Sequence, residues 1–249
     1  MTADDDTSDV DVDLDRFTAD VGRVLAVVAH PDDLEYGAAA AIAKWTELGH
    51  DVAYVLATRG EAGIDGMSPD ECGPVRAAEQ RASAAVVGVE EVEFLDLADG
   101  VLVADLALRR SLTSVIRRVR PDTVITLNHR PDWGAPGTRN SADHRALGEA
   151  LLDAIADASN RWVFAGVGGP AHRVRRAMIA SSPQARHAVE VDERHVDLAV
   201  ASLAEHRAYL DGLGDHAMAD PEFVRWQLHA SGARCGCDAA LAVELFTFG

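Results

Sequence analysis

The sequence lacks the features that would direct it to a membrane or to nucleic acid. Its 249 residues contain 23 Lys and Arg against 41 Asp and Glu, which gives a formal net charge of -18. Because phosphate backbones and anionic membranes bind basic surfaces, this deficit of positive charge argues against both as partners. No apolar run approaches the roughly 20 residues of a membrane span, and the acidic start lacks the basic-then-apolar order of a signal peptide. We therefore expect a cytoplasmic protein.

Cysteine is scarce, and a chain of this length does not depend on disulfides. There are three cysteines, Cys72, Cys235 and Cys237, an odd number. The Cys235-Gly-Cys237 pair has three interpretations: metal ligands, a strained disulfide, or two free thiols in a turn. The sequence has no second cysteine pair to complete a zinc site, which favours free thiols.

Neither a linker nor an internal repeat divides the chain. Residues 1–20 are predicted to form an acidic, mobile tail because aspartates crowd this segment and Arg16 is its only base. These aspartates are Asp4, Asp5, Asp6, Asp9, Asp11, Asp13, Asp15 and Asp20. Hydrophobic residues make up 48% of the chain and charged residues 26%, so a sizeable core can be buried. We expect one domain over residues 21–249; the sequence leaves open whether it forms a homo-oligomer.

Apolar runs and helix-forming segments alternate along the chain. Strands are predicted at 23–29, 52–58, 92–95 and 123–127, and helices at 38–48, 75–87, 105–118 and 142–156. This alternation predicts an α/β fold with a doubly wound, mostly parallel, Rossmann-like sheet, whose ligands gather beyond the carboxyl ends of the strands. A less regular C-terminal extension follows, with strands at 176–181, 188–191 and 240–248 and helices at 194–209 and 222–228.

The polar residues that end the first strand have the character of a metal site. His30, Asp32 and Asp33 follow a run that is almost wholly apolar. A turn there would let His30 and Asp33 reach one ion while Asp32 faces the attacking water. Catalytic zinc typically takes three protein ligands from His, Asp or Glu and leaves a fourth position for water. The alternative is an ordinary turn in which an aspartate caps the next helix.

A third ligand must come from another segment, and His144 is the best candidate. It follows the loop after the fourth strand, so it would lie at the same edge of the sheet as His30. The alternative is that Ser141 or Asp143 caps the following helix and His144 is solvated. Such a cap is also compatible with metal binding by His144. Asp143 could also orient a neighbouring ligand, as metal sites usually require.

Four motifs, in this order along the chain, resemble the LmbE-like (PIG-L) family of N-deacetylases. They are AHPDD at 29–33, TRGEAG at 58–63, RAAE at 76–79 and ADH at 142–144. The resemblance covers residues 23–156 clearly, and EHRAYL at 205–210 fits more loosely. It implies that His30, Asp33 and His144 bind one zinc ion, for which other divalent metals can substitute, and that Asp32 is the general base.

The resemblance also implies a substrate site. Arg76 corresponds to a substrate-binding arginine, Asp99 to an acidic residue that contacts sugar hydroxyls, and Glu61 to a glutamate that lines the pocket. The alternatives are a surface charge for Arg76 and a turn residue for Asp99.

The implied reaction is hydrolysis of the acetamide of an N-acetylated amino sugar, within a small conjugate of the N-acetylglucosamine type, to acetate and a free amine. Such conjugates in the family include precursors of thiol cofactors, glycolipid anchors and glycopeptide antibiotics. One alternative is hydrolysis of an amide in a thiol-cofactor conjugate or another non-sugar compound. A second is a non-catalytic sugar- or nucleotide-binding module, but no G-x-G-x-x-G follows the first strand.

One position departs from the family pattern. Members commonly carry HxDH, in which the first histidine helps to stabilise the oxyanion, and this chain has Ser141 there. A serine hydroxyl donates a hydrogen bond but cannot act as a cationic acid near neutral pH. The candidates to take over the role of the missing histidine are His129, Asn140 and His187. The alternative for each is an ordinary loop or surface residue.

Overall fold

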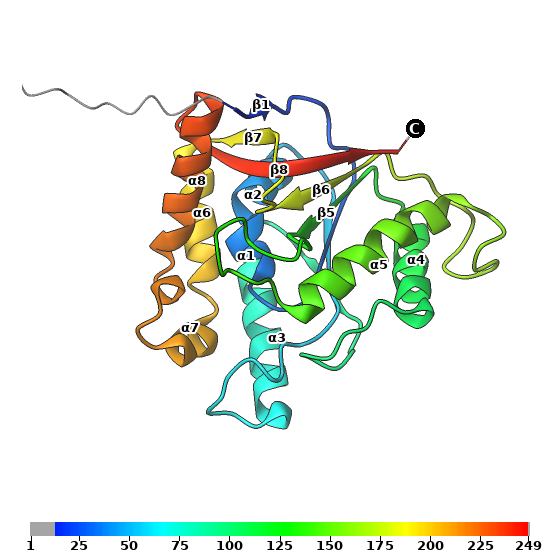
Figure 1. Ribbon diagram of the computed structural model, residues 1–249, viewed down its shortest axis with the longest axis horizontal. Coiled ribbons are helices and arrows are strands. Elements are labelled where there is room, and N and C mark those ends of the chain that lie inside the picture. The colour runs from blue at the N-terminus through cyan, green and yellow to red at the C-terminus, as the bar shows by residue number, and fades with distance from the viewer. Residues whose placement is uncertain (1–12, 249) are drawn as a thin grey trace, which may run out of the picture.

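In the computed structural model, residues 13–248 are described, and they share one eight-stranded sheet (Figure 1). The strands are β1 (Asp15–Arg16), β2 (Val24–Val28), β3 (Val52–Leu56), β4 (Glu91–Phe94), β5 (Thr123–Leu127), β6 (Arg176–Ala180), β7 (His187–Val191) and β8 (Ala239–Thr247). Their order across the sheet is β1-β7-β8-β6-β5-β2-β3-β4. Strand β8 is antiparallel to β6 and β7, and the other neighbouring pairs are parallel. The predicted α/β class with a mostly parallel sheet is confirmed.

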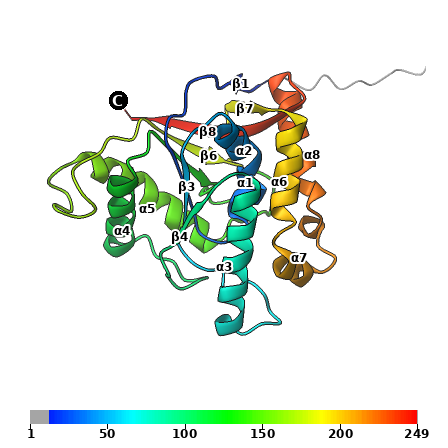
Figure 2. The ribbon, with the colours of Figure 1, turned by 180° about the vertical axis from the view of Figure 1, so that it is seen from behind.

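Helices cover both faces of this sheet. They are α1 (Asp33–Gly37), α2 (Ala39–Glu47), α3 (Pro69–Val86), α4 (Leu106–Val119), α5 (Ala142–Ser159), α6 (Glu193–Leu203), α7 (Arg207–Leu213), the 3-10 helix η1 (Ala217–Ala219) and α8 (Glu222–Cys235). Alternate residues of β2 point to opposite faces, because successive side chains of a strand do so. Val24, Ala26 and Val28 join the core with α2 and α6, whereas Leu25 and Val27 join the core with α4 and α5. Figures 1 and 2 show these two helical layers on either side of the sheet.

The tail predicted over residues 1–20 is too long. Leu14 is only 4% exposed, and Asp15–Arg16 pairs with β7. Asp13 forms a salt bridge of 2.8 Å with Arg234. An apolar side chain and a strand edge therefore hold the segment that begins at residue 13, and the earlier aspartates lie outside the described residues.

Helix α3 begins at Pro69, earlier than the predicted start at residue 75. Ser68 and Glu71 form a reciprocal capping box, in which Glu71 Oε2 accepts the Ser68 amide at 3.2 Å. Proline is favoured at the first position of a helix because its missing N–H needs no partner there. Pro74 lies inside α3, beyond its first turn, and has no N–H to donate to the carbonyl of Asp70.

The C-terminal region is more regular than the predicted extension, since it adds three strands and three α-helices to the domain. The helix predicted at 194–209 breaks between α6 and α7, where His206 turns inward and lies 3.5 Å from Glu35. The helix predicted at 222–228 continues to Cys235 and ends at Gly236, whose φ of +69° suits glycine.

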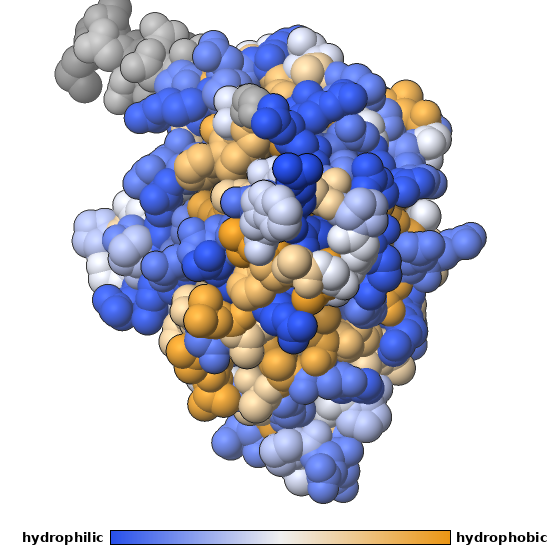
Figure 3. All heavy atoms as spheres, turned by 90° about the vertical axis from the view of Figure 1, so that its right-hand side faces the viewer, coloured by the Kyte–Doolittle hydropathy of each residue, from blue (hydrophilic) through white to orange (hydrophobic). Residues whose placement is uncertain are grey.

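Cys235 and Cys237 are not joined by a disulfide, and free thiols stay the prediction for this pair. No helix within residues 13–248 combines the length and apolarity needed to cross a bilayer. Figure 3 looks onto the side of the molecule that carries α4 and α5, where apolar side chains gather in the lower half.

Candidate active site

The turn after β2 adopts a conformation that non-glycine residues rarely take. Asp32 has φ of +79°, in the left-handed region, and it is 5% exposed. Its amide donates to Gln80 Oε1 at 3.0 Å, and its carbonyl accepts the amide of Tyr36 at 3.1 Å. Such a conformation persists only where its surroundings fix it. Here α3 supplies the fixing contact, through Gln80.

The structure brings the three predicted ligands together at the carboxyl edge of the sheet. His30, Asp33 and His144 each offer one atom, and these atoms lie within 4.8 Å of one another. His144 Nε2 is 3.0 Å from Asp33 Oδ1 and 3.3 Å from His30 Nδ1. Zinc bonds of about 2.0–2.2 Å place the ligands of one ion roughly 3–3.6 Å apart. The cluster therefore fits a small divalent cation.

Neighbouring groups orient each ligand of this cluster. Asp33 Oδ2 accepts the backbone amides of Ala29 and His30, which leaves Oδ1 facing His144. His144 Nδ1 lies 2.9 Å from Asn140 Oδ1, so the ring donates there and presents Nε2 to the cluster. A fixed partner of this kind sets the tautomer of a metal-binding histidine.

His30 is oriented by two carboxylates. Its Nε2 lies 3.1 Å from Asp99 Oδ1 and 3.3 Å from Asp143 Oδ2. Asp143 also accepts the amides of Gly100 and Leu102, at 2.8 and 3.0 Å. The residues His30, Asp99 and Asp143 form a second group with ligand spacing. Because the Asp143 oxygens already hold two backbone amides, the first group is the better metal site.

The charges in the cluster favour a bound cation. Burial alone would lower the pKa of His30, but Asp33, Asp143 and Asp99 raise this pKa well above its ordinary value. Burial likewise opposes the shift at Asp33, but His144 and His30 hold its pKa well below the usual range. A divalent ion among these groups would take the place of the protons on the histidines.

Asp32 faces a different environment from Asp33. Burial raises the pKa of Asp32 to about 7, and the charge of Arg76 acts in the opposite direction. Arg76 Nη2 donates to Asp32 Oδ2 at 2.6 Å, within a buried salt bridge. The two adjacent carboxylates therefore have different partners: Asp33 contacts the two histidines, and Asp32 forms a salt bridge with an arginine.

Arg76 lines the cavity described below, and substrate binding by it stays a prediction, but most of its guanidinium donors are engaged within the protein. It is 2% exposed and donates to the carbonyls of Gly60 and Pro31 as well as to Asp32. The ring of Tyr209, in α7, lies 4.5 Å from its central carbon. Arg76 therefore fixes the position of the Asp32 carboxylate from α3.

Asp99 and Glu61 differ in whether they line the cavity. Asp99 lines the cavity described below, and its Oδ2 accepts the amide of Ala62 at 2.8 Å. The Glu61 carboxylate accepts the amides of Asp99 and Arg59, at 2.9 and 3.2 Å. Glu61 is absent from the described residues that line the cavity, so it supports the loop that carries Asp99.

Ser141 is the N-cap of α5, since its Oγ accepts the amide of His144 at 3.1 Å, and it also lines the cavity. Of the candidates to replace the missing imidazole, Asn140 donates its side-chain amide to the carbonyls of Asn128 and Arg130. His129 lies against Gly148 of α5, and His187 begins β7. Neither histidine is among the described residues that line the cavity.

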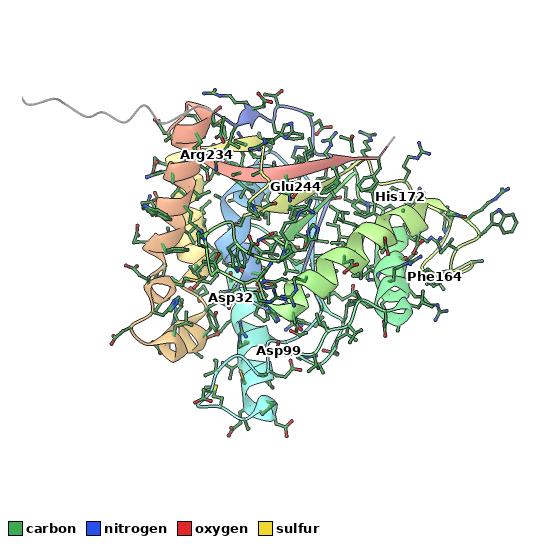
Figure 4. The ribbon with its side chains drawn as sticks, in the orientation of Figure 1. Asp32, Asp99, Phe164, His172, Arg234 and Glu244 are labelled. Atoms are coloured by element: carbon green, nitrogen blue, oxygen red, sulfur yellow. The ribbon has the colours of Figure 1, made fainter. Side chains whose placement is uncertain are left out.

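The cluster opens into a cavity of about 890 Å³ between α1, α8 and the loops at the carboxyl edge of the sheet. Asp32, Asp99 and Arg234 all line it, and Figure 4 shows Asp32 and Asp99 at one end and Arg234 far along α8. Trp133 lies beside the site, with its ring 5.9 Å from that of His144 and nearly perpendicular to it.

Sequence reasoning missed Gln80, Tyr209 and Trp133. Gln80 follows Arg76 by four residues, and positions four apart share one face of a helix. That spacing was a usable signal for Gln80. Tyr209 belongs to the EHRAYL segment that resembles the family loosely, but no role was predicted for it. Trp133 reaches the site through a tertiary contact from a distant segment, for which the local sequence carries no signal.

The sequence profile of the family described as PIG-L: GlcNAc-PI de-N-acetylase matches residues 25–155, more than half of the chain. The chain belongs to this family. The match includes His30, Asp32, Asp33 and His144.

Two relatives whose names describe deacetylases are similar in sequence. A diacetylchitobiose deacetylase of Thermococcus kodakarensis is 34% identical over 151 residues, which cover 60% of this chain and 55% of that protein. A 1D-myo-inositol 2-acetamido-2-deoxy-alpha-D-glucopyranoside deacetylase of Kineococcus radiotolerans is 28% identical over 226 residues, which cover 78% of this chain and 58% of that protein. The chain spans less than two thirds of the length of either relative.

A solved structure supports the fold. The N,N'-diacetylchitobiose deacetylase from Pyrococcus horikoshii superposes with a TM-score of 0.78 at 22% identity, covering 92% of this chain and 85% of that chain. At this identity the likeness concerns the fold alone, because one fold supports many functions.

Proposed function

We propose that this chain is a zinc-dependent N-deacetylase that hydrolyses the acetamide of an N-acetylated amino sugar. The observation that carries the proposal is the cluster of His30, Asp33 and His144, next to Asp32, at the inner end of the cavity. The names of the two similar family members describe deacetylases of N-acetylated sugars. The substrate is accordingly a small conjugate of the N-acetylglucosamine type.

His30, Asp33 and His144 would hold the metal. When bound, zinc supplies positive charge that polarises the acetamide carbonyl and offsets the charge that develops on its oxygen. Asp143 and Asn140 keep the two histidine rings in the orientation that this requires.

Asp32 moves the proton. Arg76 holds its Oδ2, and we assign to its Oδ1 the proton of the attacking water. A pKa of about 7 suits a group that must accept a proton and then release it near neutral pH. Asp32 then returns that proton to the leaving nitrogen, so that acetate and a free amine result.

The test is acetate release from N-acetylated sugars by zinc-loaded protein, together with metal analysis of variants. Asp32→Asn should keep the ion and lower turnover by about 10² or more, the usual scale for a lost general base. Asp33→Asn and His144→Ala should lose the ion on dialysis. Equal metal loss from the Asp32 and Asp33 variants would show that their roles are assigned wrongly.

The screen also separates the alternatives. Sugar binding without acetate release, by protein that carries the metal, would indicate a non-catalytic module. Release from N-acylated thiol conjugates but from no sugar would indicate the non-sugar amide hydrolase.

A further inference from the structure

The cavity is larger than an acetamide site requires. Its volume of about 890 Å³ lies near the upper end of the range for pockets that hold drug-sized ligands, roughly 300–1,000 Å³. One hexosamine fills only part of such a space. The cavity continues from the metal cluster along α8, where its lining includes Phe223, Trp226, Gln227 and Ser231.

A row of three aromatic side chains lines this continuation. Tyr36 lies in α1, three residues after Asp33, and its hydroxyl donates to the carbonyl of Met218 in η1. The rings of Tyr36 and Phe223 are 6.3 Å apart between centroids, and those of Phe223 and Trp226 are 6.0 Å apart. The row therefore leads from the helix that carries a metal ligand to α8.

The outer end of the row is exposed. Trp226 is 66% exposed, and Phe223 is partly exposed beside it. Large aromatic side chains left open to water at the mouth of a cavity are typical of a ligand-binding surface, because covering them removes apolar area from water. A group attached to the sugar would cover both rings.

The polar groups along the outer part are few, and two of them are already bound. Arg234 donates through Nε and Nη2 to Asp13, and Ser182 Oγ donates to Glu244 at 2.6 Å. Gln227 and Ser231 remain among the described lining residues of α8. A second sugar ring can also stack on aromatic rings, but its hydroxyls need hydrogen-bond partners, whereas an aryl or alkyl group needs apolar walls alone.

We infer that Tyr36, Phe223 and Trp226 form a subsite for an apolar aglycone, an aryl or alkyl group linked to the sugar that carries the acetamide. This inference depends on the proposed function, because it names the substrate class of the same site. The substrate is accordingly an amphipathic glycoside with its sugar at the metal cluster and its apolar group along α8.

The test compares glycosides of N-acetylglucosamine that differ only in the aglycone. We expect kcat/KM for acetate release to be about tenfold higher for the phenyl and hexyl glycosides than for the methyl glycoside, since aromatic contacts of this kind contribute on that scale. Trp226→Ala and Phe223→Ala should each reduce this ratio severalfold and leave the methyl glycoside within about twofold. Trp162→Ala is the matched control, because Trp162 is 76% exposed and is not among the described lining residues.

The outcomes separate the subsite from the reaction. Equal kcat/KM across the glycosides, or a preference for N,N'-diacetylchitobiose over the phenyl glycoside, would overturn the subsite and keep the deacetylase. If no glycoside releases acetate, calorimetry with phenyl β-D-glucopyranoside, which has no acetamide, tests the subsite alone. Binding that Trp226→Ala weakens about tenfold would support it, and equal binding by the two proteins would overturn it.

Discussion

Replacing Arg76 with methionine tests whether this arginine stabilises the site from within the protein. The change leaves the buried Asp32 carboxylate without its cation, and it removes the Arg76 donor from the carbonyl of Pro31. The carbonyl of Gly60 also loses Arg76 but still accepts the amide of Gly63. Arg59 offers a matched control, because its salt bridge with Asp96 has the same length of 2.6 Å. The two pairs differ in exposure: the side chains of Arg76 and Asp32 are 3% and 7% exposed, and those of Arg59 and Asp96 are 41% and 60% exposed.

The burial of each salt bridge decides how much its loss lowers the free energy of unfolding. Removing one partner of a buried pair costs about 3–5 kcal/mol in the free energy of unfolding. An exposed pair contributes about 1 kcal/mol or less. Since 1 kcal/mol shifts Tm by about 2–4 °C in a chain of this size, Arg76→Met should lower Tm by roughly 6–20 °C and Arg59→Met by less than about 4 °C. Thermal denaturation followed by circular dichroism measures both.

The kinetics of the same variant distinguish a positioning role from substrate binding. If Arg76 holds Asp32, Arg76→Lys at a temperature where it is folded should lower kcat more than it raises KM. Equal Tm shifts for the Arg76 and Arg59 variants, or a rise in KM at unchanged kcat, would refute the reasoning.

Three further predictions concern the surrounding scaffold. Burial lowers the pKa of His206, but the Glu35 carboxylate more than offsets this and raises it. A raised pKa stabilises the fold below about pH 6.5 and loses that effect as the pH rises through the folded value, so His206→Gln should lower Tm more at pH 6 than at pH 9. Gly232→Ala places a Cβ 2.7 Å from the Ala239 backbone, and urea denaturation should show a loss of about 1–3 kcal/mol. Ser141→Ala removes a helix cap and should cost about 1 kcal/mol by the same assay, with turnover reduced tenfold at most.

The sequence predicted that the candidate metal ligands lie close together, because of how parallel strands are connected. His30 follows β2 directly, and His144 begins a helix shortly after β5, which is the neighbour of β2. The carboxyl ends of parallel strands meet at one edge, so polar residues at these ends converge even though their sequence positions are far apart. Asp33 joins them because it opens the helix after β2.

The surroundings of Arg76 could not be predicted in the same way. The motif placed this residue at a helix start, but α3 begins at Pro69, so Arg76 lies on the third turn and faces inward. Its partners are two backbone carbonyls and a side chain from two separate loops, and local sequence does not encode such contacts. For the same reason, the aromatic row of Tyr36, Phe223 and Trp226 joins α1 to α8 without a signal in either segment.

The adjacent carboxylates Asp32 and Asp33 show why spacing alone does not assign chemical roles. Both are about 5% exposed, yet the pKa of one is raised to about 7 and the pKa of the other is held well below the usual range. The left-handed backbone at Asp32 turns the two side chains toward different partners, an arginine for Asp32 and two histidines for Asp33. Separated pKa values of this kind support the proposed roles, which are proton transfer for Asp32 and cation binding for Asp33. Gln80 contributes to this separation, because its Oε1 accepts the Asp32 amide and so helps to fix the left-handed backbone.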